Sequence, residues 1–278
     1  YDEALNTIDE GLGLDCGSLN LSFYINKGLT YTLMEDYNKA VDVYKKAIET
    51  YPKNAELWFN KGLAYEKAEN LEEAIKAYKT AITLKPTYAL PHLQLGNICY
   101  RQERITQALM CFNVYLLLII DDENAFSVLQ SLNSIVADKN KNEANPDLEI
   151  SLDDTAFDEM DLVLNNKIAL NKKYKTGHKI EIALTKQNHA LLEQIKNFEG
   201  NDGFWDKKYV PLFKWIVEND LFENFTYTLC YPIENKKYAK IVKNNEKNII
   251  DFLEKFYDKW RTIMRVNTIE FDGKTQDV

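Results

Sequence analysis

A spacing of 34 residues recurs through the first 122 residues of the chain. Glycine stands at positions 28, 62 and 96, and alanine stands at positions 40, 74 and 108. An aromatic side chain follows each alanine by four residues, at Tyr44, Tyr78 and Phe112. A fixed period of this length indicates a repeat architecture, in which each unit packs on its neighbours and cannot bury its apolar surface alone. The predicted units are 21–54, 55–88 and 89–122.

Each unit has the residue pattern of two amphipathic helices. In the second unit, Trp58, Gly62 and Tyr65 fall at i, i+4 and i+7 and therefore share one helical face. Ala74 and Tyr78 share a face of the following segment in the same way. Gly62 and Ala74 lack bulk, so the two helix backbones can approach closely while aromatic rings fill the space beside them. One unit is thus predicted to be a helical hairpin.

This set of residues resembles the tetratricopeptide repeat (TPR). The family pattern places an aromatic residue, Gly and Tyr on a first helix, and a small residue, an aromatic residue, a second small residue and Pro on the next. The resemblance covers residues 1–122. It implies an all-α fold in which TPR hairpins stack into an α-α superhelix (solenoid), followed by a C-terminal helical region. No family is identified for residues 123–278.

The third unit departs most from the pattern. Cys99 stands where Tyr is expected, Tyr115 stands where a small residue is expected, and Ile120 replaces Pro. The bulk of Tyr115 and the apolar run after it indicate that the last helix packs against something other than a fourth regular unit. An amphipathic segment at 123–138 is predicted to cap the open end of the array.

The start of the chain keeps the register of a second helix. Tyr1 and Ala4 match the places of Tyr37 and Ala40. We therefore expect residues 1–20 to be the second helix of a truncated unit in a longer protein. Its apolar face is an expected contact with another polypeptide.

Composition and charge limit the function classes. Gly (10) and Pro (6) are scarce, which favours helices over turn-rich β structure. The 43 acidic and 34 basic residues give a net charge of −9, which argues against a general polyanion binder, so nucleic acid is not an expected partner. The segment 236–265 carries nine basic and four acidic residues, and nucleic-acid binding by this segment stays a weaker third hypothesis.

Acidic residues concentrate between positions 143 and 161, where eight of them occur with no Lys or Arg and are interleaved with apolar residues. One interpretation is an acidic linker at 139–156 that leads into a helical domain at 157–278. The other is an acidic-hydrophobic motif that docks on another surface. A calcium loop is poorly supported, because Gly and Glu are missing at the required spacing. The helices predicted after the linker are 157–173, 179–198, 205–219, 221–230 and 236–265.

The TPR resemblance implies a concave groove lined by the first helices of the units. By resemblance, the fifth, sixth and ninth places of each unit look into it, and two further residues are expected at its mouth. Amides can both donate and accept hydrogen bonds, which suits an extended peptide backbone, while a hydrogen bond within the stack or to water is the alternative. The candidate groove residues are Asn26, Asn60 and Gln94 at the sixth places, Ile25, Phe59 and Leu93 at the fifth places, and Tyr100 and Arg101 at the mouth.

One TPR subgroup grips chaperone C-termini with a clamp of basic residues. Of its pattern only Asn60 is present here. The places expected to be basic carry Ile25, Leu90 and Gln94. Binding of a chaperone tail is therefore not expected.

Catalytic, cofactor and metal motifs are missing from the sequence. His178 and His189 are eleven residues apart, which matches no HExxH-type spacing, and there is no GxSxG, GxxxxGK[ST] or GxGxxG motif. We expect no catalytic residue, no cofactor and no metal. The four cysteines form no CxxC pair, and the longest apolar run has seven residues, so we expect reduced thiols, no membrane span and a cytoplasmic location.

The first hypothesis of function is a non-catalytic scaffold or adapter that binds a segment of a partner protein in the concave TPR groove. The alternative is an enzyme or enzyme regulator whose site lies in the C-terminal helical half, with the TPR units recruiting substrate. A deep polar pocket with several carboxylates in that half would favour the alternative, and a continuous apolar packing face would favour the scaffold.

Overall fold

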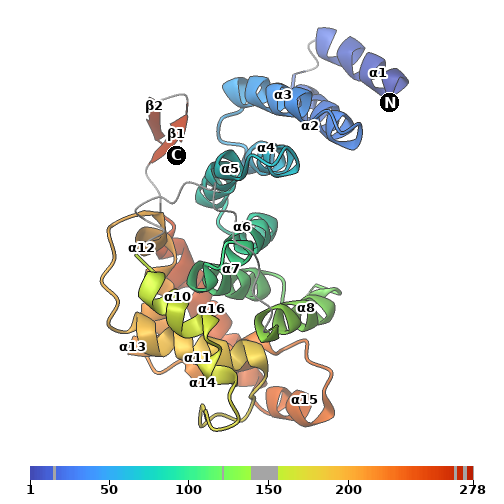
Figure 1. Cartoon of the computed structure of the whole chain (residues 1–278). Helices are drawn as coiled ribbons and strands as arrows, with labels where there is room; N and C mark the ends of the chain where they lie inside the picture. Colours follow the sequence, from blue (N-terminus) through green and yellow to red (C-terminus); the bar gives the residue numbers. More distant parts are fainter. Residues whose placement is uncertain (15–16, 121, 139–155, 266–267, 272–273, 278) are drawn as a thin grey trace. The chain divides into compact units, whose positions relative to one another are not determined.

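The computed structural model describes residues 1–14, 17–120, 122–138, 156–265, 268–271 and 274–277 (Figure 1). The chain divides into two compact units, called here unit 1 (Tyr1–Pro91 with Val266–Val278) and unit 2 (His92–Arg265). The boundary between them falls within the third predicted repeat. Cys16 and, except for residue 156, the predicted acidic linker lie outside the described residues.

Unit 1 is built from helical hairpins that correspond to the two regular repeats. Helices α2 (Leu19–Leu33) and α3 (Tyr37–Thr50) form one hairpin, and α4 (Ala55–Lys67) and α5 (Leu71–Leu84) form the next. The helices of each pair are in contact, α3 also contacts α4, and α1 (Asp2–Gly13) contacts α2. Packing between consecutive helices confirms the predicted all-α, TPR-like solenoid.

The helices of each hairpin approach closely at the glycine of the repeat. A Cβ atom added at Gly62 would lie 2.5 Å from the ring of Tyr78, and one added at Gly96 would lie 2.6 Å from the ring of Phe112. Both rings are fully buried. Because a methyl group cannot share space with a packed ring, the small residue at this place sets the distance between the helices.

The turn inside each repeat has one backbone conformation that recurs with the same period. Glu35, Glu69 and Glu103 have φ angles of 61°, 62° and 59°. This left-handed conformation costs a residue with a side chain roughly 1 kcal/mol. The turn is held by a hydrogen bond characteristic of a Schellman motif. The three N–H donors and their carbonyl acceptors, each pair at 2.9 Å, are Asp36 to Tyr31, Asn70 to Tyr65 and Arg104 to Cys99.

Two short strands follow near the end of the chain. Strand β1 (Thr268–Phe271) pairs antiparallel with β2 (Lys274–Asp277), with Thr268 opposite Asp277. The sequence analysis did not predict this hairpin. Four residues per strand are too few for an alternating pattern to stand out.

Unit 2 is arranged around α7 (Ile105–Leu118). This helix is buried along nearly its whole length and contacts α8 (Ala125–Ala137), α10 (Asp158–Asn165) and α14 (Phe222–Leu229). A helix that is buried on nearly all sides and mostly apolar lies in a core. The expectation that it packs against something other than a fourth regular unit is confirmed. The remaining elements are most of α6 (Ala89–Arg101), the 3-10 helix η1 (Ile168–Leu170), α11 (Ala183–Ile195), α12 (Phe204–Lys208), α13 (Val210–Glu218), α15 (Lys236–Lys243) and α16 (Glu246–Ile263).

Two buried polar contacts join the third repeat to the rest of unit 2. His92, at the aromatic place of that repeat, is fully buried with Nδ1 2.6 Å from the hydroxyl oxygen of Tyr209. Asn113 of α7 and Asn188 of α11 exchange two hydrogen bonds of 2.7 and 2.8 Å. Buried amides and imidazoles need such partners, so these contacts specify how the helices of unit 2 pack.

Some predicted helix boundaries in unit 2 were wrong. The segment 236–265 is two helices, because Asn244 and Asn245 interrupt it and the Asn245 side chain donates to the Ile241 carbonyl at 2.8 Å. The segment 157–173 contains only α10 and η1. Lys167 separates them with a left-handed φ of 52°.

Candidate functional site

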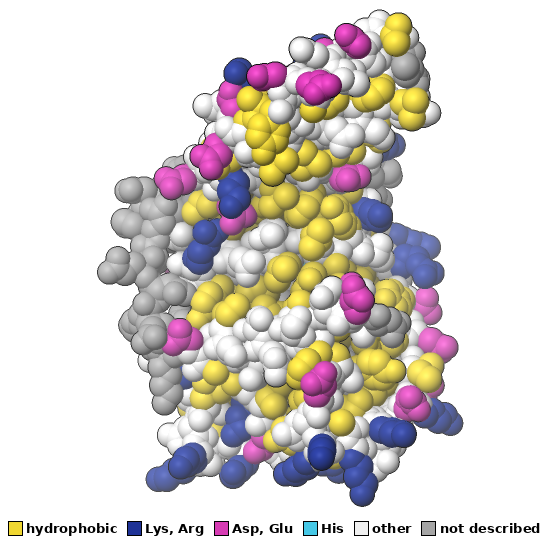
Figure 2. Space-filling view, turned by 90° about the vertical axis from the view of Figure 1, so that its right-hand side faces the viewer, with side chains coloured by type: hydrophobic (Ala, Val, Ile, Leu, Met, Phe, Trp, Pro, Cys, Tyr) yellow, Lys and Arg dark blue, Asp and Glu magenta, His cyan; other side chains and the backbone are white. Residues whose placement is uncertain are grey.

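In unit 1 the first helices α2 and α4 contact each other as well as their own hairpin partners. Ile25, Leu29 and Leu33 follow each other every four residues and so lie along one side of α2. Leu29 is 38% exposed and Leu33 is 66% exposed, while Ile25 is half-buried. Figure 2 looks toward the side of the first helices, and hydrophobic side chains (yellow) gather over unit 1 at the top of this view, with carboxylates among them. We call Ile25, Leu29 and Leu33 the apolar stripe.

Two of the three predicted groove amides lie on these helices. Asn26 of α2 is exposed, whereas Asn60 of α4 is buried, with 7% of its surface exposed. Within the described residues neither side chain has a hydrogen-bond partner. The polar atoms of both side chains are nevertheless not sealed off from solvent. Their donors and acceptors can therefore bond to water or to a bound segment.

Phe59 is the apolar neighbour of Asn60 and is only 5% exposed. Its ring centroid lies 5.9 Å from that of Tyr78 and 5.2 Å from that of Tyr88. Such tilted and edge-to-face pairs stabilise a core. Phe59 is therefore mainly a packing residue under this face, and most of its surface is covered by its own chain.

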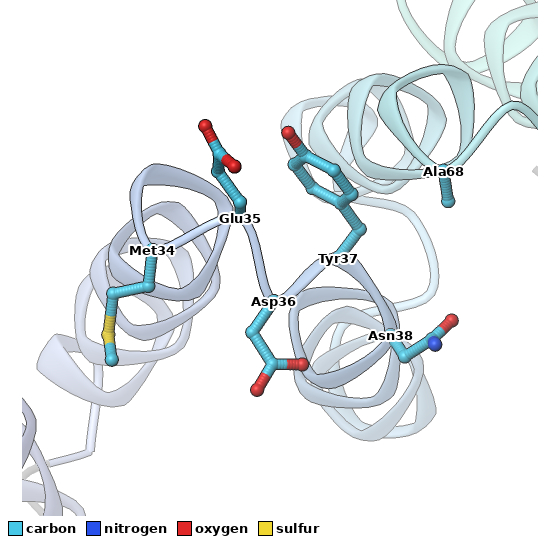
Figure 3. Close-up of a pocket in the computed structure, with 6 residues that line it drawn as sticks. All are labelled: Met34, Glu35, Asp36, Tyr37, Asn38 and Ala68. Carbon is cyan, nitrogen blue, oxygen red and sulfur yellow. The ribbon is translucent and has the colours of Figure 1, made fainter.

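A hollow of about 520 Å³ lies at the turn between α2 and α3, where the end of α4 also reaches (Figure 3). The side chains of Glu35 and Tyr37 project to one side of the turn and that of Asp36 to the other. Asp36 accepts from the N–H of Lys39 at 3.3 Å and pairs with its ammonium at 2.6 Å. The hydrogen bond from the Lys39 ammonium lowers the pKa of Asp36. The sequence analysis did not single out these residues, because a turn shows no helical periodicity.

The other four predicted groove residues belong to unit 2. Leu93 and Gln94 are half-buried, and the Gln94 side chain accepts from that of Asn97 at 3.4 Å. Tyr100 donates to the carbonyl of Ile135 in α8 at 2.8 Å. The exposed Arg101 is the last residue of α6. The structure thus places four of the candidates in each unit.

Unit 2 brings together two histidines that the sequence keeps apart. The ring centroids of His178 and His189 are 5.7 Å apart, and each ring contacts Phe222. Tyr174 holds His189, with its hydroxyl 2.5 Å from Nδ1, and donates to Glu193 at 2.8 Å. We call these five residues the histidine cluster.

The histidine cluster borders a pocket of about 230 Å³ that also includes Lys196 and Asp220. Burial lowers the pKa of His189, and the nearby His178 lowers it further, against the effect of Glu193. A neutral imidazole held at Nδ1 keeps Nε2 available as a base. No sequence spacing indicates this cluster, because the 171–182 segment that carries Tyr174 and His178 has no regular helix.

Some site types were searched for only within the described residues. There, no group of three or more His, Cys, Asp or Glu side chains is arranged to hold a metal ion. None of the helices in this part of the chain is long and apolar enough to cross a membrane. Cys99, Cys111 and Cys230 are buried and form no disulfide among the described residues, and burial raises the pKa of Cys230 to about 12.

Two family models of known repeats match residues of unit 1. The family model described as tetratricopeptide repeat matches residues 55–88, and a second model described as TPR repeat matches residues 28–69. A search of curated proteins found no match to the chain.

Proposed function

Because residues 28–88 are tetratricopeptide repeats, we propose that the chain is a non-catalytic adapter that binds a segment of a partner protein on the first-helix face of unit 1. TPR repeats are protein-interaction modules in general. The observation that supports this face is the combination of the amides of Asn26 and Asn60, which have no hydrogen-bond partner among the described residues, with the exposed Leu29 and Leu33.

The apolar stripe and the amides suit different parts of a peptide. Leu29 and Leu33 offer contact to apolar side chains, and contiguous exposed leucines at one helical spacing favour an interaction role over a purely solvated surface. The amides of Asn26 and Asn60 can each donate to a carbonyl and accept from an N–H of a bound backbone. Leu93, Gln94, Tyr100 and Arg101, which belong to unit 2, stay predicted peptide-binding residues.

The test is selection of peptides followed by loss of binding in defined variants. Random peptides of about 15 residues are displayed on phage and selected on the full chain. Affinities of the selected peptides are then measured by calorimetry. The double variant Asn26→Ala with Asn60→Ala and the single variant Leu33→Ser should each weaken binding about tenfold or more. The exposed Asn6 of α1 gives the control Asn6→Ala, which should leave the affinity unchanged.

Phe59 is a poor position for this test. Truncation of a side chain packed against Tyr78 and Tyr88 would cost about 3 kcal/mol or more of stability and would weaken binding through unfolding. The selected peptides could bind the double variant and the Leu33 variant as tightly as they bind the unchanged chain. This result would contradict binding at the first-helix face.

A second candidate function is an enzyme or enzyme regulator with its site in unit 2. The histidine cluster favours it, since a neutral His189 oriented by Tyr174 and Glu193 beside a pocket is an arrangement suited to general base chemistry. Hydrolysis of a panel of nitrophenyl esters and phosphates by the full chain tests this function. Turnover that is lost in His189→Phe and kept in Asn26→Ala would support it.

We also propose a reducing compartment such as the cytoplasm. Cys99, Cys111 and Cys230 are buried and form no disulfide within the described residues, which supports this location because thiols stay reduced there. Microscopy of the tagged full-length protein tests it.

A further inference from the structure

A second hollow, of about 420 Å³, lies in unit 2 between α8 and the segment that connects α14 to α15. Its walls are mainly apolar. Phe126 and Leu129 come from α8, Ile182 from the segment before α11, Ile233 from the connection, and Tyr238 from α15. The volume falls within the range of about 300–1,000 Å³ found for pockets that enclose a ligand.

This hollow is the open side of a hydrophobic cluster. Ile182, Ile233 and Tyr238 are only partly buried, and they pack on a buried cluster that includes Tyr227 and Val242. One side of each of these three side chains is thus covered by the core and the other side faces the hollow. An apolar group that entered would extend an existing core, which is favourable by about 25 cal/mol for each Å² of apolar surface removed from water.

Helix α15 places positive charge next to the hollow. Lys236, Lys237, Lys240 and Lys243 are all exposed, and within the described residues none of them has an ion-pair partner. The ammonium of Lys237 lies 5.5 Å from the ring centroid of Tyr238, a wall residue, so positive charge reaches the rim.

The rest of the rim is nearly neutral. Gln130 and Asn133 of α8 and Asn235 are uncharged, and Glu234 is the acidic side chain among the lining residues. Four unpaired lysines against one carboxylate leave a local excess of positive charge. A partner that brings carboxylates would complement this excess, and the effect would weaken with added salt.

We propose that this hollow is a docking site for an acidic segment of a partner protein, which inserts one or two apolar side chains between α8 and Tyr238 and faces its carboxylates toward α15. The apolar walls favour a peptide over a nucleic acid, whose backbone has no apolar side chain to insert. They also favour a peptide over a membrane surface, because Ile241 and Val242 of α15 are turned into the core and cannot enter a bilayer.

The test uses a fluorescein-labelled peptide of about 14 residues, with Leu or Phe at every third or fourth position and Asp or Glu elsewhere, and follows its anisotropy with the full chain. The variant Gln130→Trp should fill the hollow and weaken binding at least tenfold. Ser134→Trp, an exposed position on the same helix that does not line the hollow, should change binding less than twofold. The charge reversal Lys240→Glu with Lys243→Glu should also weaken binding at least tenfold. The matched reversal Lys247→Glu with Lys255→Glu on α16 should change it less than twofold.

Three results would overturn the proposal. The two charge reversals could weaken binding equally, which would show unspecific attraction. The peptide could bind Gln130→Trp as tightly as the unchanged chain. A single-stranded oligonucleotide or phosphatidylserine vesicles could bind in place of the peptide and lose binding in Lys240→Glu with Lys243→Glu. Because this hollow lies in unit 2, the Asn26→Ala with Asn60→Ala variant should bind the acidic peptide normally, so failure of one proposal leaves the other intact.

Discussion

The carboxylate of Asp161 in α10 accepts a hydrogen bond of 2.7 Å from the backbone N–H of Thr106, in the first turn of α7. In the regular repeats the second helix is capped by its own preceding residue, Asp36 for α3 and Asn70 for α5. The corresponding residue of the third repeat, Arg104, provides no side-chain acceptor. The cap is therefore supplied from 55 residues away, and α7 depends on the C-terminal helices to satisfy its first turn.

The Asp161 cap predicts a difference between two substitutions at one site. Asp161→Ala removes the acceptor and should destabilise unit 2 by about 1–2 kcal/mol, the usual cost of a lost cap. Asp161→Asn keeps an oxygen that can accept from Thr106 and should retain most of the stability. Urea denaturation measures both, with the exposed Glu159→Ala on the same helix as control. Equal losses in the Ala and Asn variants would argue against a capping role.

The same carboxylate predicts how stability depends on pH. Burial raises the pKa of Asp161 from 3.8 to about 7, against the hydrogen bond from the Thr106 N–H that lowers it. The folded state then binds a proton more tightly than the unfolded state, so this group makes stability fall as the pH rises from about 4 to about 7. Asp161→Asn cannot ionise. The stability of this variant relative to the unchanged chain should increase over that interval and level off above it, and a constant difference from pH 4 to pH 8 would contradict the prediction.

The same substitution, Gly to Ala, should have opposite effects on stability at Gly62 and at Gly13. Gly62→Ala places a methyl group 2.5 Å from the ring of Tyr78 and should destabilise unit 1 by about 1–3 kcal/mol, because the packed helices must move apart. A methyl group at Gly13 meets no atom within 4 Å, so Gly13→Ala should be neutral or stabilise by up to about 1 kcal/mol. Thermal unfolding of both variants measures the contrast. Similar melting temperatures would show that the repeat tolerates bulk at this place.

The histidine cluster predicts a lowered pKa for His189. Burial and the neighbouring His178 both lower the pKa of His189, so this imidazole should titrate below its ordinary value of 6.5. Because the folded state then binds a proton less tightly than the unfolded state, this group makes the free energy of unfolding fall as the pH falls from 6.5 through the lowered pKa. His178→Gln removes one of the two causes and should shift the titration of His189 upward, as measured by NMR of the imidazole carbons. An unchanged titration would mean that the two rings do not interact electrostatically.

The fold of unit 1 was predictable because its determinants are local. Gly62 and Tyr78 are 16 residues apart, and their types alone indicate a close hairpin that neighbouring units repeat. The exposure of the candidate site was less predictable. Phe59 was expected to contact a partner, yet it packs between Tyr78 and Tyr88, whereas the exposed Leu33 was not singled out. Burial depends on which neighbours cover a side chain, and a helical pattern does not say this.

The arrangement of unit 2 could not be predicted, because its contacts are distant in sequence. Asp161 carries no signal that it caps Thr106, since capping patterns join residues within one turn. His178 and His189 meet only because the irregular segment before α11 folds back on that helix. Helix existence was predicted more closely than helix length, as the break at Asn244 and Asn245 shows.

The recurring turn provides a last prediction, which concerns strain. Glu69 adopts a φ of 62°, where a side chain is disfavoured and glycine is not. Glu69→Gly relieves this strain of roughly 1 kcal/mol but adds freedom to the unfolded chain, so the net effect should be a stabilisation of unit 1 by up to about 0.5 kcal/mol. Lys46→Gly, at an exposed position inside α3, has no strain to relieve and should cost about 1 kcal/mol. Urea denaturation measures the free energy of unfolding of both variants and of the unchanged chain. A loss of stability in both variants would mean that the left-handed turn carries little strain and that the side chain of Glu69 makes a favourable contribution of its own.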